Sequence, residues 1–163
     1  MTRDRVAAHN EEDKNEVEQL SLEKAATHLL EECRMVLPGV QALLGFQLIA
    51  VFNAGFRDTL SRTEQLVHLV AILLVVVSVA MVMAPAAIHR VREPLSVSRG
   101  FIRLSSRLLM LGMAPLAIGT AADVYLVARI VSESIALAAG AAVVGLAAFV
   151  TLWAIVPIRA RLH

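Results

Sequence analysis

The chain is poor in the residues that build disulfides, metal clusters and catalytic sites. Its single cysteine, Cys33, excludes an intrachain disulfide and a cysteine metal cluster. It has no Gly-rich phosphate loop, no His-Glu-x-x-His, no Cys-x-x-Cys and no Gly-x-Ser-x-Gly motif. His68 and His89 lie about 30 Å apart on a straight helix, too far to share a metal. The sequence therefore predicts a protein that is not an enzyme and that uses no metal or cofactor.

Aromatic residues are also scarce, at 4% of the chain. Single-stranded nucleic acid is usually bound by aromatic side chains set in a positively charged groove. Here the basic residues lie at the ends of apolar segments without an aromatic platform, and the net charge is only +1. These features argue against nucleic acid as a partner.

Apolar sequence, in contrast, is abundant. Hydrophobic residues make up 58% of the chain, and the mean hydropathy is +0.70. Four runs of about 21 to 25 residues contain no Lys, Arg or Glu, and a helix needs roughly 20 apolar residues to cross a bilayer core of about 30 Å. We therefore expect an all-α, polytopic integral membrane four-helix bundle over residues 36–163. Its spans are predicted near residues 36–56, 66–88, 106–127 and 134–156.

Basic residues are unevenly distributed between the two ends of these spans. Short loops that are rich in Lys and Arg are retained on the cytoplasmic side of a membrane. The loops after the first and third spans hold only Arg57, Arg62 and Arg129. Nine basic residues lie at the opposite ends of the spans: Lys24, Arg34, Arg90, Arg92, Arg99, Arg103, Arg107, Arg159 and Arg161. Both termini and the central loop are therefore predicted to be cytoplasmic.

The polar N-terminal segment does not resemble a secretory signal. It lacks a short basic start, a brief apolar core and a small-residue cleavage site, so we expect it to be retained. Residues 1–16 mix many charges with few apolar residues, a composition that predicts disorder.

An amphipathic helix is predicted over residues 17–37, where apolar residues recur at three- and four-residue steps. Residues 1–32 hold nine acidic and four basic residues, which disfavours strong binding to anionic lipid. This cytoplasmic or interfacial helix is expected to pack on its own protein, on a second copy or on the arginine-rich loop. Pro38 then marks either a first helical turn or a kink.

Three amides interrupt the first span: Gln41, Gln47 and Asn53. At six-residue steps they lie about 120° apart around the helix axis, so they do not all line one pore. One interpretation is that they form hydrogen bonds between helices of the bundle. The other is that they line part of an ion or solute pathway.

Asp123 is the one charged residue within the four apolar runs. An ion pair with Arg57 or Arg129 would give it a structural role. A carboxylate inside a membrane is also a candidate for binding a proton or cation, with His68 and Asn53 expected near it. Snorkelling of the side chain to the membrane interface is the third interpretation.

Small residues predict which helix faces meet. The third span carries a small and polar stripe within a narrow arc, expected to face other helices and formed by Ser105, Gly112, Pro115, Gly119 and Asp123. The second span has one heptad-spaced line of Ala71, Ser78 and Pro85. The fourth span has small residues at a spacing that also favours close packing but is common by chance: Ala136, Gly140, Ala141 and Gly145.

Basic side chains follow the second span. These residues are expected to contact lipid headgroups or a protein partner: His89, Arg90, Arg92, Arg99, Arg103 and Arg107. Cys33 completes the apolar face of the amphipathic helix and is expected to pack there. Palmitoylation of Cys33 beside the membrane is the alternative.

Several of these residues also carry a resemblance: Glu32, Arg34, Pro38, Gly39, Gln41, Phe46, Ala84, Pro85, His89, Arg90 and Gly112. From about residue 20 onward the chain resembles an uncharacterised bacterial family of short four-span membrane proteins, classed as a domain of unknown function. The resemblance implies a helical protein of the bacterial cytoplasmic membrane and no established activity. A sodium–proton antiporter label on similar chains is matched only by Asp123, because inverted repeats and broken helices are not evident.

Two classes of function follow. The first is a non-catalytic membrane module that associates with lipid, with a further copy of itself or with another protein. The alternative is an oligomeric channel or transporter subunit whose polar residues would be Gln41, Gln47, Asn53, His68 and Asp123.

Overall fold

The computed structural model describes the backbone of residues 2–92, 97–156 and 159, and the side chains of residues 14–91, 97–156 and 159. Within these residues the chain is helical and contains no strand, which confirms the predicted all-α class. The elements are α1 (Thr2–Phe52), α2 (Gly55–Thr59), α3 (Arg62–Arg92), α4 (Arg99–Ser132), α5 (Ile135–Val150) and a π-helical turn at Thr151–Ile155.

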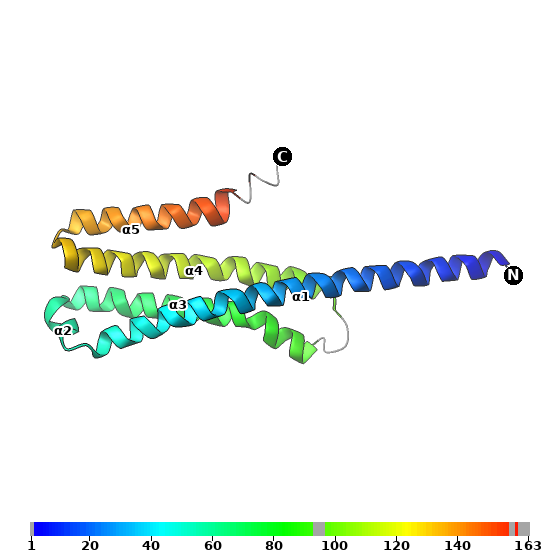
Figure 1. Ribbon diagram of the computed structural model, residues 1–163, viewed down its shortest axis with the longest axis horizontal. Helices are drawn as coiled ribbons and strands as arrows, with labels where there is room; N and C mark the ends of the chain where they lie inside the picture. The colour runs from blue at the N-terminus through cyan, green and yellow to red at the C-terminus, as the bar shows by residue number, and fades with distance from the viewer. Residues whose placement is uncertain (1, 93–96, 157–158, 160–163) are drawn as a thin grey trace.

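The four long helices run in alternating directions, so the connections lie at two ends of the molecule (Figure 1). One end, called the α2 end here, holds α2 and the turn between α4 and α5. The other end holds the end of α3, the start of α4 and the last turns of α5. The first part of α1 extends well beyond this end. Short connections make neighbouring helices antiparallel, as in an up-and-down bundle.

Four helical segments among the described residues are long and apolar enough to cross a membrane: Lys14–Phe52, Arg62–Val91, Arg99–Ser132 and Ile135–Ile155. They overlap the four predicted spans in order. Charged residues gather toward the ends of these segments, and Asp123 is the charged residue that lies within one of their apolar runs. The number and order of apolar helices were therefore predictable from the sequence.

α1 differs from the prediction in being one continuous helix. Residues 2–16, which were predicted to be disordered, and residues 17–37 belong to the same helix as the first span. Pro38 lies inside α1 and does not end it. Proline is tolerated in apolar helices when the backbone groups that it frees are satisfied locally. Good helix formers on both sides of Pro38, such as Leu37 and Leu43, favour continuation of the helix.

α3 and α4 form the centre of the bundle, and small residues bring them together. A Cβ atom on Gly119 would lie 3.1 Å from the backbone oxygen of Ala71 and 3.2 Å from Val75. A Cβ atom on Gly112 would lie 3.2 Å from the Cβ of Met81. Both contacts are tight, so glycine sets the distance between these helices. The predicted stripe of α4 does face another helix.

The heptad-spaced line of α3 faces the same interface, because Ala71, Ser78 and Pro85 are buried. Ser105 of α4 is buried as well. The two serine hydroxyls have no side-chain hydrogen-bond partner among the described residues. Their small size, which lets the backbones approach, is therefore the property that the packing uses.

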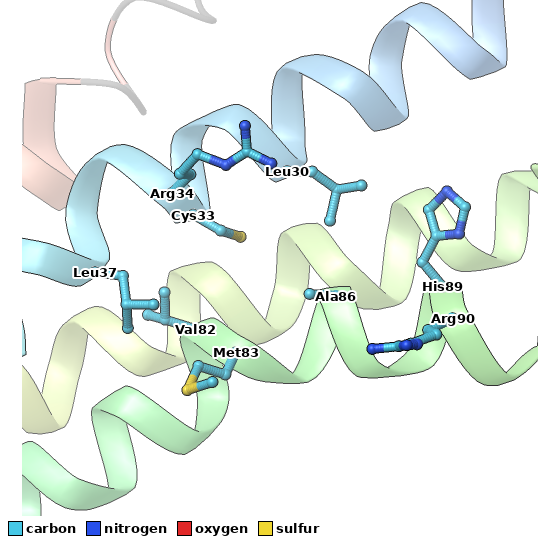
Figure 2. A pocket seen from close by; sticks show the side chains of 9 residues that line it. All are labelled: Leu30, Cys33, Arg34, Leu37, Val82, Met83, Ala86, His89 and Arg90. Atoms are coloured by element: carbon cyan, nitrogen blue, oxygen red, sulfur yellow. The ribbon is translucent and has the colours of Figure 1, made fainter.

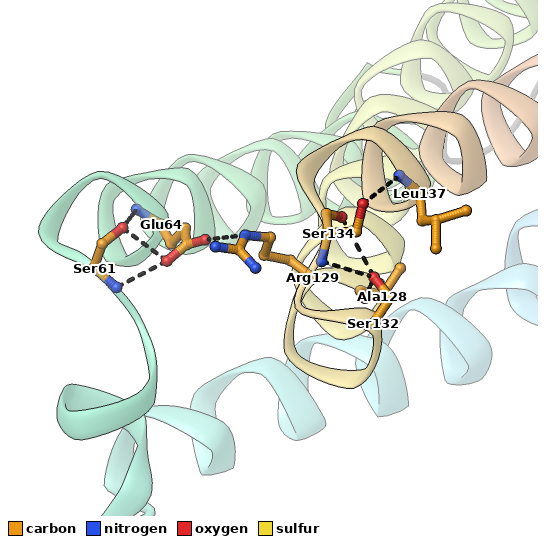
Figure 3. Close-up of polar contacts among 7 residues, drawn as sticks. All are labelled: Ser61, Glu64, Ala128, Arg129, Ser132, Ser134 and Leu137. Carbon is orange, nitrogen blue, oxygen red and sulfur yellow. Dashed lines mark hydrogen bonds and ion pairs between the residues drawn. The ribbon is translucent and has the colours of Figure 1, made fainter.

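α5 packs along α4 at the edge of the bundle (Figure 1). Ala138 is its buried residue, and Gly140 and Gly145 have open space where a Cβ would stand. The turn before α5 contains Glu133 in the left-handed conformation, with φ of 54°, and its backbone N–H donates to the oxygen of Arg129. Ser134 then caps α5 by accepting from the Leu137 N–H (Figure 3).

The middle of α1 is held against α3 and α4 by apolar contacts and one ion pair. Leu29 and Cys33 pack with Val82 and Leu109, which agrees with the packing role expected for Cys33. Ala26 packs in a second cluster with Val97 and Phe101. Ahead of these clusters, Arg99 Nη2 lies 2.8 Å from Glu18 Oε1. The acidic helix therefore contacts the arginine-rich segment of its own chain.

Candidate functional site

A buried polar cluster joins three helices toward the α2 end of the bundle. The side chains are Gln47 of α1, His68 of α3 and Asp123 of α4. Gln47 Nε2 donates a hydrogen bond of 2.6 Å to Asp123 Oδ2. His68 Nε2 lies 2.9 Å from the backbone oxygen of Gln47, and its Nδ1 lies 3.6 Å from Asp123 Oδ1. Gln47 and His68 are almost fully buried, and the Asp123 side chain is 19% exposed.

The geometry constrains the protons of this cluster. A backbone carbonyl only accepts hydrogen bonds, so His68 Nε2 carries the hydrogen that faces Gln47. A neutral imidazole would then present an acceptor at Nδ1 to a carboxylate, which is repulsive. One further proton, on the imidazole or on the carboxyl group, makes this contact favourable. The pair of His68 and Asp123 is therefore suited to hold one proton.

A cavity of about 250 Å³ adjoins the cluster. Besides the three polar residues, its walls are apolar and come from α1, the short helix α2, and the two central helices. The Phe56 ring of α2 stacks at a tilt on His68, with 5.3 Å between ring centroids. Gln47 Oε1 is buried and has no partner among the described residues. The cavity thus has a polar wall and otherwise apolar lining, and it opens to the outside beside the exposed Phe46 and Val127.

The ion pair expected between Asp123 and Arg57 or Arg129 is absent from the described residues. Arg129 Nε instead lies 3.3 Å from Glu64 Oε1 (Figure 3). Arg57 is exposed and lines a separate hollow beside α3. Asp123 and Arg129 are six residues apart on α4, about 9 Å along the axis, so they are not neighbours on the helix surface and each reaches a different residue of α3.

Only part of the predicted polar pathway comes together. Gln47, His68 and Asp123 meet, whereas Gln41 is exposed on α1 and Asn53 is exposed after the end of that helix. The Asn53 side chain accepts from the backbone N–H of Gly55 at 3.1 Å, which is a local turn contact. The amides of the first span therefore have three different environments.

The basic residues after α3 also separate. The His89 ring packs edge-on against Phe101, with 5.4 Å between centroids. Arg90 is exposed beside a cleft between α1 and α3. Arg103 and Arg107 are exposed along α4, and Arg99 pairs with Glu18. The side chain of Arg92 lies outside the described residues.

Glu64 has a role that the sequence analysis did not assign. Ser61 and Glu64 form a capping box at the start of α3: the Ser61 N–H donates to Glu64 Oε2 at 2.8 Å, and the Glu64 N–H donates to Ser61 Oγ at 3.3 Å (Figure 3). The pattern Ser-x-x-Glu before an apolar run is a sequence signal for this arrangement. Glu64 thereby caps one helix and anchors Arg129 of another.

These features define a class: an all-α bundle with four helices long and apolar enough to cross a membrane and a polar cluster between them. The chain belongs to the Family of unknown function (DUF6328), whose model matches residues 15–157. This confirms the resemblance to an uncharacterised family. No curated protein and no solved structure matches the chain.

Proposed function

We propose that the protein is a non-catalytic integral membrane module that associates with a second copy of itself through the outward face of α1. The observation that carries this proposal is the exposed amide of Gln41. Gln41 lies about 16 Å from Phe52 and about 10 Å from Arg34 along the helix axis, at 1.5 Å per residue. It therefore lies near the middle of the apolar part of α1, and it has no hydrogen-bond partner among the described residues.

An unpaired amide facing lipid is unfavourable, because the hydrocarbon core offers no water to replace the missing hydrogen bonds. An amide both donates and accepts, so Gln41 of one copy can pair with Gln41 of another across a two-fold axis. This self-complementarity favours a second copy over a different protein as the partner.

The surroundings of Gln41 suit close contact between helices. Gln41, Gly45, Leu48 and Phe52 recur at four- and three-residue steps and share one face of α1. A Cβ atom on Gly45 would meet nothing within 4 Å, so this glycine lies open toward the outside. Leu48 and Phe52 are 46% and 87% exposed. Another helix can therefore approach the backbone of α1 beside the amide.

Fluorescence transfer between donor- and acceptor-labelled copies in proteoliposomes tests this proposal. Transfer should persist as lipid is added, and Gln41→Leu should weaken association about 5- to 30-fold, as expected for a hydrogen bond of about 1–2 kcal/mol. Asn53→Ala removes another exposed amide of the same segment and should leave the transfer unchanged. A wild-type protein that is monomeric at every lipid ratio would contradict the proposal. Equal weakening of association by Gln41→Leu and Asn53→Ala would show that Gln41 has no specific role in it.

A second candidate function is proton or cation transport by an assembly of these chains. Two observations favour it: the one-proton geometry of His68 with Asp123, and the cavity beside them where Gln47 Oε1 lacks a partner. At 1.5 Å per residue, Asp123 lies about 9 Å deeper along α4 than Arg129. Neither Arg129 nor Glu64 lines the cavity beside Asp123, so their ion pair does not border it.

Proteoliposomes loaded with a pH-sensitive dye test the second candidate. Transport predicts an ion-dependent pH change that Asp123→Asn abolishes while the melting temperature stays nearly unchanged. Wild-type protein without flux would exclude this function and leave the self-association proposal untouched.

For the location, we propose the bacterial cytoplasmic membrane with both termini cytoplasmic. The end of α3 and the start of α4, which carry the arginines Arg90 and Arg92 and Arg99, Arg103 and Arg107, lie at the same end of the bundle as the N-terminal part of α1 (Figure 1). The α2 end carries fewer basic residues, and this asymmetry supports the orientation.

A further inference from the structure

A cleft of about 560 Å³ opens between α1 and α3, near the end of the bundle opposite α2 (Figure 2). Leu37 of α1 and Val82 and Met83 of α3 line its apolar part. Arg34 of α1 and Arg90 of α3 lie at its border. The volume is in the range of pockets that hold small organic ligands, about 300–1,000 Å³.

The two kinds of lining residue are separated along the helix axis. Arg90 follows Val82 by eight residues, which places it about 12 Å nearer the end of the bundle. Figure 2 shows His89 and Arg90 at one side of the cleft and Leu37, Val82 and Met83 at the other. The cleft is therefore apolar toward the middle of the bundle and has Arg90 toward its end, while Arg34 lies between these two parts and Leu30 lies on the side of Arg90 (Figure 2).

Two positive charges lie at the border of the cleft. Arg34 and Arg90 are exposed, and neither forms an ion pair with another described residue. Within the part of the chain that the structure describes, no acidic residue lines the cleft: on the adjoining turn of α1, Glu31 faces His28 at 3.8 Å. Arginine binds phosphate through several directed N–H groups, and two arginines on facing helices suit a single phosphate between them.

We propose that this cleft binds one anionic glycerophospholipid, with its phosphate between Arg34 and Arg90 and one acyl chain along Leu37, Val82 and Met83. Basic pockets between membrane helices are suited to anionic headgroups. The apolar walls distinguish a lipid from a free phosphate ion, which would gain nothing from them. A bound lipid would also fill the space between α1 and α3 and strengthen their contact.

Native mass spectrometry of the full-length protein in detergent, titrated with phosphatidylglycerol, tests this site. One tightly bound lipid is expected, with weaker binding of zwitterionic phosphatidylcholine. Arg34→Gln with Arg90→Gln should weaken phosphatidylglycerol about 30-fold, which corresponds to about 2 kcal/mol. Arg57→Gln with Arg62→Gln removes the same charge from exposed positions outside the cleft and should leave this binding unchanged.

A variant that keeps both arginines distinguishes lipid binding in the cleft from nonspecific electrostatic attraction. Ala86 lines the cleft, so Ala86→Phe should fill it and also displace the lipid. Circular dichroism checks that each variant remains helical. Equal losses in the two double variants would reduce the effect to nonspecific attraction and overturn the proposal. Glycerol phosphate that competes as well as the lipid would show a phosphate site without an acyl-chain groove, which also overturns it.

Discussion

At the scale of single residues, Asp123 shows how an apolar bundle accommodates a carboxyl group. It accepts from Gln47 and faces His68, so its partners come from α1 and α3. Together these contacts tie three helices at one point. Polar groups in apolar surroundings must be paired, and this requirement fixes the rotation of the three helices relative to each other.

A double-mutant cycle measures this connection. Gln47→Leu and Asp123→Ala should each destabilise the protein, and their effects should be coupled by about 0.6 kcal/mol and at most about 1.7 kcal/mol. The measurement is the free energy of unfolding in mixed detergent micelles. Arg57→Gln serves as the control. Its effect on the free energy of unfolding and that of Asp123→Ala should be additive within about 0.5 kcal/mol, because Arg57 does not contact Asp123. If Asp123 were coupled to Arg57 but not to Gln47, the hydrogen bond between Gln47 and Asp123 would be contradicted.

The sequence revealed Asp123 as unusual but did not identify its partners. Arg57, Arg129 and His68 were all expected near the same end of the bundle as Asp123, so each was a candidate partner. The choice depends on how each helix is rotated, and tertiary packing sets that rotation. The structure brings two polar pairs onto the interface of α3 and α4: Glu64 with Arg129, and four residues further along α3, His68 with Asp123.

At the scale of helices, glycine sets the distance between α3 and α4. The sequence predicted this face of α4 correctly, because a narrow arc of small residues on an apolar helix indicates close packing. It could not tell this face from the equally small face of α5, where Gly140 and Gly145 turn out to be open. The difference lies in what each face meets, which the spacing alone does not contain.

Leucine substitutions compare these two faces directly. Gly119→Leu forces a side chain toward the Ala71 backbone, which cannot move away easily, and should destabilise the protein by about 1–3 kcal/mol. Gly140→Leu makes the same change in open space and should have little effect on stability. Thermal unfolding in detergent reports both. Similar melting temperatures for the two variants would show that Gly119 does not set the spacing.

Helix capping gives a second prediction at this scale. Ser61→Ala removes the hydroxyl of the capping box at the start of α3 and should cost about 0.5–2 kcal/mol. Thr63→Ala, two residues later at an exposed position, serves as the control and should be nearly neutral. The measurement is again the free energy of unfolding. An equal loss of stability in both variants would show that the capping box of Ser61 and Glu64 does not stabilise α3.

At the scale of the whole molecule, the four long helices are not equally enclosed. Only 6% of the most apolar window of α5 and 11% of that of α1 are buried, against 33% for α3 and 28% for α4. The central pair therefore forms the core, and the outer helices offer their surfaces to lipid or to other copies. Hydropathy predicted the spans but not this arrangement, because it does not follow burial: the two central helices have the highest and the lowest mean hydropathy of the four, 2.9 for α3 and 1.5 for α4.

Single-cysteine labelling tests the orientation of the molecule in the membrane. In a Cys33→Ser background, Thr59→Cys and Lys24→Cys place exposed thiols at opposite ends of the bundle. A reagent that does not cross membranes should label Thr59→Cys in intact cells and Lys24→Cys only after lysis. The reverse pattern would place the termini outside.

The central claim, self-association through α1, is tested most directly by cross-linking in the membrane. Leu48→Cys places a thiol two turns from Gln41 on the same face, and Val144→Cys places one on the exposed surface of α5. In a Cys33→Ser background, oxidation should yield a covalent dimer of Leu48→Cys, which Gln41→Leu prevents, and little dimer of Val144→Cys. Dimers that form equally at both positions, or that persist without Gln41, would contradict the account.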